Sequence, residues 1–143
     1  MTCTRAPRAQ RPRVCIRGPE DRSIESLGYA WLPEEDVFPF YELRSAAMDL
    51  RGGGIYDPED MGRRIRAQFK TLRAAGVRHV VLSAFGCGAF GNPADKVAAL
   101  YRKELVESGE LQHFDCVAFA IFHAGYGPNN YKPFAEAFEG VVS

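Results

Sequence analysis

The stretch His79-Val-Val-Leu-Ser-Ala-Phe-Gly-Cys-Gly-Ala-Phe-Gly-Asn-Pro93 decides the fold of this chain. It opens with an apolar, β-branched run that reaches Phe85 without a breaker, which is typical of a buried strand. Three glycines follow, and then Asn92 and Pro93, which predict a helix N-cap and a first-turn proline. Residues 94–106 carry apolar side chains at helical spacing. The stretch therefore predicts a strand, a glycine-rich loop and a helix.

The glycine-rich loop is the first candidate site. Backbone N–H groups at a helix N-terminus favour an anion, so residues 86–92 are interpreted as a phosphate or diphosphate cradle. The spacing Gly86-x-Gly88-x-x-Gly91 also fits a dinucleotide fingerprint. Against that, Pro93 delays the helix, and no acid follows the next strand to bind a ribose hydroxyl. The alternative is that the glycines only form a tight turn.

Composition limits the domain count, the partners and the compartment that we expect for the chain. A chain of 143 residues, 46% hydrophobic, predicts one domain, expected over 13–143 after a flexible basic tail at 1–12. The 18 basic and 18 acidic residues cancel, so no net field favours nucleic acid or an anionic membrane. No apolar run reaches the length of a membrane span and no secretory signal is recognisable, so we expect a cytoplasmic protein. The four cysteines form no Cys-x-x-Cys pair, which predicts neither a metal site nor a disulfide framework, and no cofactor is expected.

The pattern elsewhere alternates between strands and helices. Asp57 predicts the cap of a helix that Gly76 ends, and the continuous apolar run 115–122 predicts a central strand. The remaining expected elements are a short strand at 14–16, a loop with at most one short strand over 19–39, a strand at 40–48 and a closing helix at 131–139. This order predicts an α/β sandwich. In such a sheet, loops 49–57, 86–92 and 123–130 meet at the carboxyl ends of the strands, and the first of them offers Asp49 and Arg51.

Three segments resemble one family. They are Leu82-Ser-Ala-Phe-Gly-Cys-Gly-Ala-Phe-Gly-Asn-Pro93, then Phe114-x-x-Val-Ala-Phe-Ala-Ile-Phe122 followed by Asn130-x-x-x-Phe134 and Phe138, and finally Ser45-Ala-Ala-Met-Asp-Leu-Arg51. Together they resemble macrodomains, in particular the C-terminal part of microbial-type poly(ADP-ribose) glycohydrolases. The resemblance implies a macrodomain-like three-layer α/β/α sandwich with a mixed, mostly parallel sheet, reduced at its N-terminus.

The resemblance also implies a ligand, ADP-ribose or a related ADP-ribosyl nucleotide. Residues 86–91 would wrap the diphosphate, Phe90 would lie against the distal ribose, and Asn130 and Phe134 would lie near the adenosine end. The alternatives are a core position for Phe90 and Phe134 and a helix cap for Asn130. The full predicted ligand-binding set is Ser83, Gly86, Cys87, Gly88, Ala89, Phe90, Gly91, Asn92, Tyr126, Asn130 and Phe134.

Catalysis is the point at which the chain departs from this family. Hydrolytic members carry Gly-Gly-Gly followed by Gln-Glu-Glu, whereas no Gln-Glu-Glu follows Gly52-Gly-Gly54 here, and we interpret these glycines as a linker. The prediction is therefore a module that binds ADP-ribose, or an ADP-ribosylated macromolecule, without cleaving it. The alternative is a glycohydrolase in which Glu59 or Asp60 supplies the acid.

Two further alternatives stay open. A thiol enzyme would use Cys87, close to a helix N-terminus, with His123 at the end of a neighbouring strand. A partner-binding remnant of a larger protein would pair an exposed sheet edge with another chain. The sequence leaves the oligomeric state open.

Overall fold

The computed structural model describes residues 13–21, 23, 28–123, 125 and 127–141 and divides the chain into two compact units, 1–44 and 45–143. The single domain over 13–143 stays a prediction, and each compact unit is described by itself. The predicted tail over residues 1–12 lies outside the described residues.

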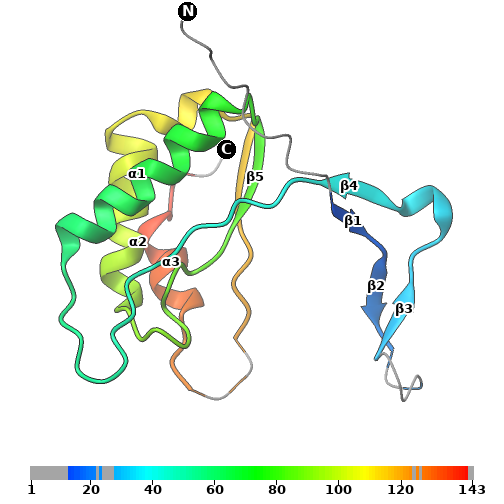
Figure 1. The fold of residues 1–143 in the computed structure, drawn as a ribbon, viewed down its shortest axis with the longest axis horizontal. Helices are drawn as coiled ribbons and strands as arrows, with labels where there is room; N and C mark the ends of the chain where they lie inside the picture. Colours follow the sequence, from blue (N-terminus) through cyan, green and yellow to red (C-terminus); the bar gives the residue numbers. More distant parts are fainter. Residues whose placement is uncertain (1–12, 22, 24–27, 124, 126, 142–143) are drawn as a thin grey trace, which may run out of the picture. The chain divides into compact units, whose positions relative to one another are not determined.

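The first unit contains two antiparallel strand pairs (Figure 1). Its strands are β1 (Arg13–Cys15) paired with β4 (Phe38–Phe40), and β2 (Arg17–Glu20) paired with β3 (Tyr29–Trp31), with the short 3₁₀ turn η1 (Glu34–Asp36) before β4. The expected strand at 14–16 agrees with β1 to within one residue, and β3 agrees with the one short strand expected within 19–39. The expected strand at 40–48 is wrong, because β4 ends at Phe40 and residues 41–50 form neither helix nor strand.

The second unit begins with the longest helix, α1 (Pro58–Ala74). The Asp57 carboxylate caps it by accepting the backbone N–H groups of residues 59 and 60 at 2.8 and 3.2 Å, as the sequence predicted. Gly76, at φ 69°, ends it: Gly76 N–H donates to Arg73 O and Val77 N–H to Leu72 O. These two bonds satisfy carbonyls that a helix end leaves unpaired.

The predicted strand, loop and helix follow α1. They are β5 (His79–Leu82), the glycine-rich loop and α2 (Ala94–Arg102), which continues through the π-helical turn η2 (Lys103–Glu107). The 3₁₀ turn η3 (Glu110–His113) then leads into β6 (Cys116–Phe119). Strands β5 and β6 pair in parallel from His79 opposite Cys116 to Leu82 opposite Phe119, which confirms the α/β class.

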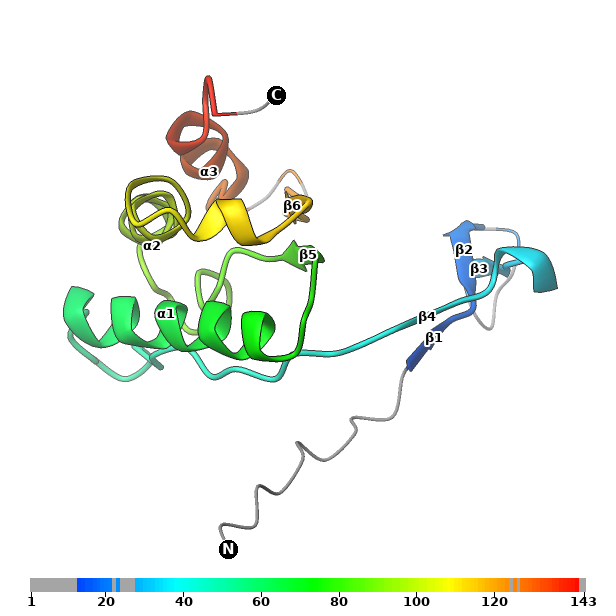
Figure 2. The same cartoon turned by 90° about the horizontal axis from the view of Figure 1, so that it is seen from above.

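The core of the second unit lies between this strand pair and the helices. Helices α1, α2 and α3 (Tyr131–Ala137) all lie to one side of β5 and β6 (Figure 2). Ring contacts join these layers: Tyr101 of α2 lies 6.0 Å from Phe69 of α1 and 5.3 Å from Phe119 of β6. The rings of Phe119 and Phe134 are 5.2 Å apart, which attaches α3 to the same core.

The other face of the strand pair is open. Val81 is 71% exposed and Phe122, just beyond β6, is 88% exposed. The sequence predicted strands buried on both faces, but within the described residues only one face is covered by helices, so the third layer of a sandwich is not formed there. Among the described helices, none has the length and hydrophobicity needed to cross a membrane.

Candidate glycine-loop site

Two consecutive tight turns shape the glycine-rich loop. Cys87 N–H donates to Ala84 O and Gly91 N–H donates to Gly88 O, each at 3.0 Å. Asn92 N–H donates to Gly86 O at 3.1 Å and closes the loop onto its own beginning. The loop is therefore held by its backbone before any side chain contributes.

Gly86 is required by both conformation and space. Its φ is 75°, a region that other residues rarely adopt. A Cβ atom there would lie 2.5 Å from the Cβ of Ala47 and 2.6 Å from the Nδ2 of Asn92. Gly88 differs, because nothing lies within 4 Å of the Cβ that it would carry. Gly86 is thus a folding requirement, whereas Gly88 leaves open space at the surface of the loop.

The exposed part of the loop carries unused hydrogen-bond donors. Within the described chain, the backbone N–H groups of Gly88, Ala89 and Phe90 donate to no acceptor. Gly88 and Ala89 are exposed, and the N-terminus of α2 follows at Ala94. Consecutive free N–H groups close to a helix N-terminus are suited to an anion such as phosphate.

Asn92 corrects a prediction. The sequence predicted it as the N-cap of the following helix, but Pro93 holds that position and no side chain caps α2. Asn92 is only 3% exposed, and its Nδ2 donates to Met48 O at 2.7 Å and to Gly86 O at 2.9 Å. Two carbonyl oxygens thus accept from the amide, so the buried Asn92 side chain braces the loop. Its Oδ1 has no partner among the described atoms.

The segment before Gly52 lies against the loop, as the convergence of strand-end loops predicted. Leu50 N–H donates to Phe90 O at 3.0 Å. The Arg51 guanidinium lies 5.0 Å from the centroid of the Phe90 ring and pairs with the Asp49 carboxylate. Hydrogen bonds from Arg51 lower the pKa of Asp49 to about 2. Phe90 is half-buried beneath this cation, so it is not enclosed in the core.

Asn130, the residue before α3, also contacts the loop. Its Nδ2 donates to Cys87 O at 3.4 Å. The predicted alternative, a helix cap, belongs to its neighbour: Asn129 Oδ1 accepts the N–H groups of Tyr131 and Lys132 at 3.0 and 3.2 Å. The sequence analysis placed Asn129 with Asn130 in the loop 123–130 but assigned the cap to Asn130, whereas the side chain of Asn129 supplies it.

Other predicted ligand-binding residues lie elsewhere. Phe134 is 3% exposed and packs in the core, which agrees with the alternative of a core position. Cys87 is 5% exposed, and burial, with a smaller contribution from Asp95, raises the pKa of its thiol to about 11. That pKa disfavours the thiol-enzyme alternative. Ser83 is exposed at the loop entrance, and Tyr126 lies outside the described residues.

The candidate catalytic acids lie in the first turn of α1. Asp60 forms ion pairs with Arg63 and, at 2.7 Å, with Arg64. Hydrogen bonds from Arg64 and Arg63 hold the pKa of Asp60 below its usual value, so its carboxyl is a poor proton donor. Glu59 is exposed. In the part of the chain that the structure describes, no cluster of His, Cys, Asp or Glu could hold a metal ion.

Tyr56 lies in the loop 49–57, and the sequence analysis gave it no role. Its hydroxyl is buried without a hydrogen-bond partner among the described atoms, and burial raises its pKa to about 12. The Lys96 ammonium lies 5.5 Å from the ring centroid, which connects the start of α1 to the first turn of α2.

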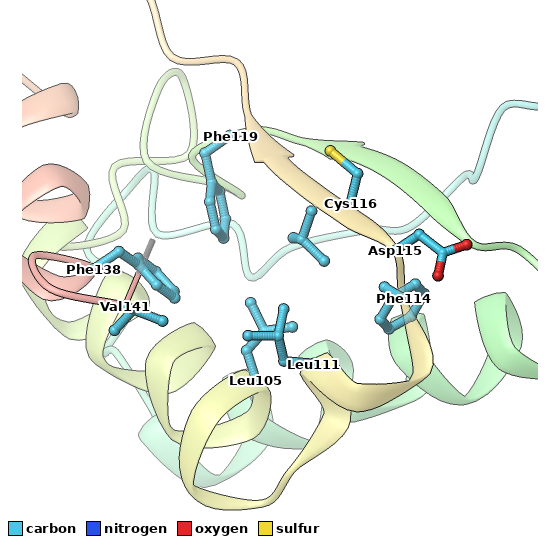
Figure 3. Close-up of a pocket in the computed structure, with 9 residues that line it drawn as sticks. Leu105, Leu111, Phe114, Asp115, Cys116, Phe119, Phe138 and Val141 are labelled. Carbon is cyan, nitrogen blue, oxygen red and sulfur yellow. The ribbon is translucent and has the colours of Figure 1, made fainter. Parts of the chain in front are cut away.

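A separate, mostly apolar cavity of about 490 Å³, partly open to solvent, lies beneath β6 (Figure 3). Leu105, Phe119 and Phe138 are among the side chains that line it. No residue of the glycine-rich loop lines it, so it is distinct from the candidate site.

Among the comparisons with known proteins, the one with solved structures finds similar proteins. No family model and no curated protein sequence matches the chain. The fold is similar to poly(ADP-ribose) glycohydrolase from Deinococcus radiodurans in complex with ADP-ribose, at 28% identity over 59% of this chain and 34% of that one, with a TM-score of 0.54. It is also similar to the glycohydrolase from Thermomonospora curvata bound to the inhibitor ADP-HPD, at 31% identity over 63% of this chain and 36% of that one, with a TM-score of 0.54.

These similarities confirm the resemblance stated from the motifs. About 60% of the chain is similar in fold to part of these microbial poly(ADP-ribose) glycohydrolases, which have a macrodomain-like fold. The chain spans about a third of the length of the solved structures that it matches.

Proposed function

We propose that this chain binds ADP-ribose or a related ADP-ribosyl nucleotide, with the diphosphate on the glycine-rich loop. The observation that carries the proposal is the row of free N–H groups at Gly88, Ala89 and Phe90 on a loop that is braced from both sides. Similarity to glycohydrolase structures that hold ADP-ribose supports this choice of ligand over other anions.

Each part of the loop has a separate task in this proposal. The free N–H groups donate to the phosphate oxygens, and the dipole of α2 adds positive potential. Gly88, which lacks a side chain, allows the phosphates to approach the backbone closely. The Phe90 ring supplies an apolar surface for the distal ribose. Asn92 and Asn130 hold the loop without using the donors that face the ligand.

The test is calorimetry with ADP-ribose, with AMP and NAD as comparators. Gly88→Ala is the informative variant, because its methyl group enters open space and leaves the fold intact while obstructing the phosphates. We expect it to weaken ADP-ribose binding by about tenfold or more, since several charge-assisted hydrogen bonds lengthen. Gly18→Ala, in the other unit, has ordinary contacts at 3.5 Å and serves as the control. The absence of heat with ADP-ribose at high micromolar concentration would contradict the proposal.

Glycohydrolysis is the second candidate, favoured by the named activity of the similar structures. It is tested by chromatographic detection of ADP-ribose released from poly(ADP-ribose). If release occurs, Glu59→Gln and Asp60→Asn are compared. Unchanged turnover in both variants would exclude these two acids as proton donors, and no release by the wild type would leave binding as the function.

A further inference from the structure

Arg51 is fixed in place by more contacts than its exposure would suggest. Its side chain is 64% exposed, yet Nε donates to both carboxylate oxygens of Asp49, at 2.8 and 3.1 Å, and Nη2 donates to one of them at 2.6 Å. The guanidinium also lies over the Phe90 ring, and the Leu50–Phe90 backbone bond holds the two segments together. Asp49 thus holds one edge of the guanidinium and Phe90 lies against its face.

The opposite edge of the guanidinium remains available. Neither N–H of Nη1 has a partner in the described chain, and neither does the second N–H of Nη2. Phe90, the ring beneath the cation, also carries one of the three free backbone N–H groups of the loop. A fixed cation with unused donors therefore lies beside a row of backbone donors.

We propose that Arg51 is a specificity-determining residue, which donates to the phosphate groups of an ADP-ribosyl ligand and makes the loop selective for a diphosphate. The proposal rests on the function proposed above. The planar guanidinium can bind two phosphate oxygens at once, whereas a backbone cradle alone serves a single phosphate equally well. Asp49 is the positioning residue, since it orients the guanidinium before the ligand arrives and so reduces the rotamer entropy lost on binding.

The experiment measures binding of ADP-ribose and of inorganic pyrophosphate to the full chain at two salt concentrations, with inorganic phosphate as the single-phosphate comparator that reports selectivity. The variants are Arg51→Gln and Arg51→Lys. Arg44→Gln is the matched control, because Arg44 is also an exposed arginine whose Nε bonds the acid two residues earlier, Glu42, at 3.2 Å. Thermal melting of each variant reports on folding.

We expect Arg51→Gln to weaken both ligands about tenfold or more and to reduce the salt dependence of binding. Arg51→Lys keeps the charge but loses the fork, so we expect a partial loss of about three- to fivefold. Arg44→Gln should bind as the wild type does. A role in folding alone would shift the melting temperature and leave the salt dependence unchanged.

Two results separate this inference from the proposed function. If the wild type binds ADP-ribose and Arg51→Gln binds it equally well, the inference fails and the proposed function stands. If the wild type binds pyrophosphate through Arg51 but does not bind ADP-ribose, the cation site stands and the proposed function fails. Binding of neither ligand overturns both.

Discussion

The Nδ2 atom of Asn92 donates to the carbonyl oxygen of Met48 at 2.7 Å, across 44 residues of sequence. The same nitrogen also donates to Gly86 O at 2.9 Å. One buried amide therefore joins the segment that carries Arg51 to both ends of the glycine-rich loop. The geometry of the candidate site depends on this amide more than on the side chains that face solvent.

Asn92→Ala should destabilise the second unit. It removes the side-chain donor of Met48 O and one of the two donors of Gly86 O, which still accepts the backbone N–H of residue 92, and a part-buried acceptor left unpaired costs about 1–3 kcal/mol. We therefore expect a decrease of about 1–3 kcal/mol in the free energy of unfolding, measured by urea denaturation. Asn129→Ala is the control, since it removes an exposed helix cap worth about 1 kcal/mol. Equal losses in the two variants would contradict the bracing role.

Gly86→Ala and Gly88→Ala should differ although the chemical change is the same. At Gly86 the new methyl group meets Ala47 and Asn92 at a φ of 75°, and strain with overpacking costs about 2–4 kcal/mol. At Gly88 the methyl group meets nothing within 4 Å, so the change in stability should stay within about 0.5 kcal/mol. Denaturation midpoints measure both variants. A Gly88→Ala loss as large as that of Gly86→Ala would show that the two glycines have equivalent structural roles.

The thiols of Cys87 and Cys116 should differ in their reactivity in the folded chain. Burial raises the pKa of Cys87 to about 11, so the group stays protonated and unreactive at pH 8 in the folded chain. Unfolding returns the thiol to an ordinary pKa of about 8.5 and should release its reactivity. Cys116 is exposed and should react in the folded state. Iodoacetamide labelling with peptide mapping, with and without urea, measures this. Rapid labelling of folded Cys87 at pH 7 would favour a thiol enzyme again.

The cavity beneath β6 permits a paired test of packing. Val117 lines it, so Val117→Ile adds a methylene to empty space and should stabilise the fold by about 0.5–1 kcal/mol. Val97 is 0% exposed in a closed part of the core, and Val97→Ile should destabilise by about 1–3 kcal/mol through overpacking. Thermal melting distinguishes the two. Destabilisation by both would show that the cavity cannot accept an added methylene.

Local sequence was sufficient to predict much of this fold. The period of Met61, Ile65, Phe69 and Leu72 predicts the buried face of α1, and Asp57 and Gly76 predict its ends. These signals act within a few residues, so no tertiary information is needed to interpret them. The strand, loop and helix around Gly86 were predicted for the same reason.

Contacts between residues far apart in the sequence determine the features that local sequence did not predict. Asn92 is chemically suited to cap a helix, and only the arrival of Met48 O beside it explains why its side chain turns inward. Val81 belongs to a run that is typical of a buried strand, but its exposure depends on which elements cover the sheet, and that information is not contained in the run itself. The pairing of Arg51 with Phe90 joins residues that periodicity cannot relate.

The parallel pairing of β5 with β6 also has a consequence for how the chain folds. A parallel pair cannot close as a hairpin, so the whole crossover through α2, η2 and η3 must be in place before Asn130 can reach the loop. Contacts of such high sequence separation form slowly and late. The anion site should therefore be among the last parts of the second unit to form during refolding, and ligand binding would report completion of folding, whereas α1 helicity would report its onset.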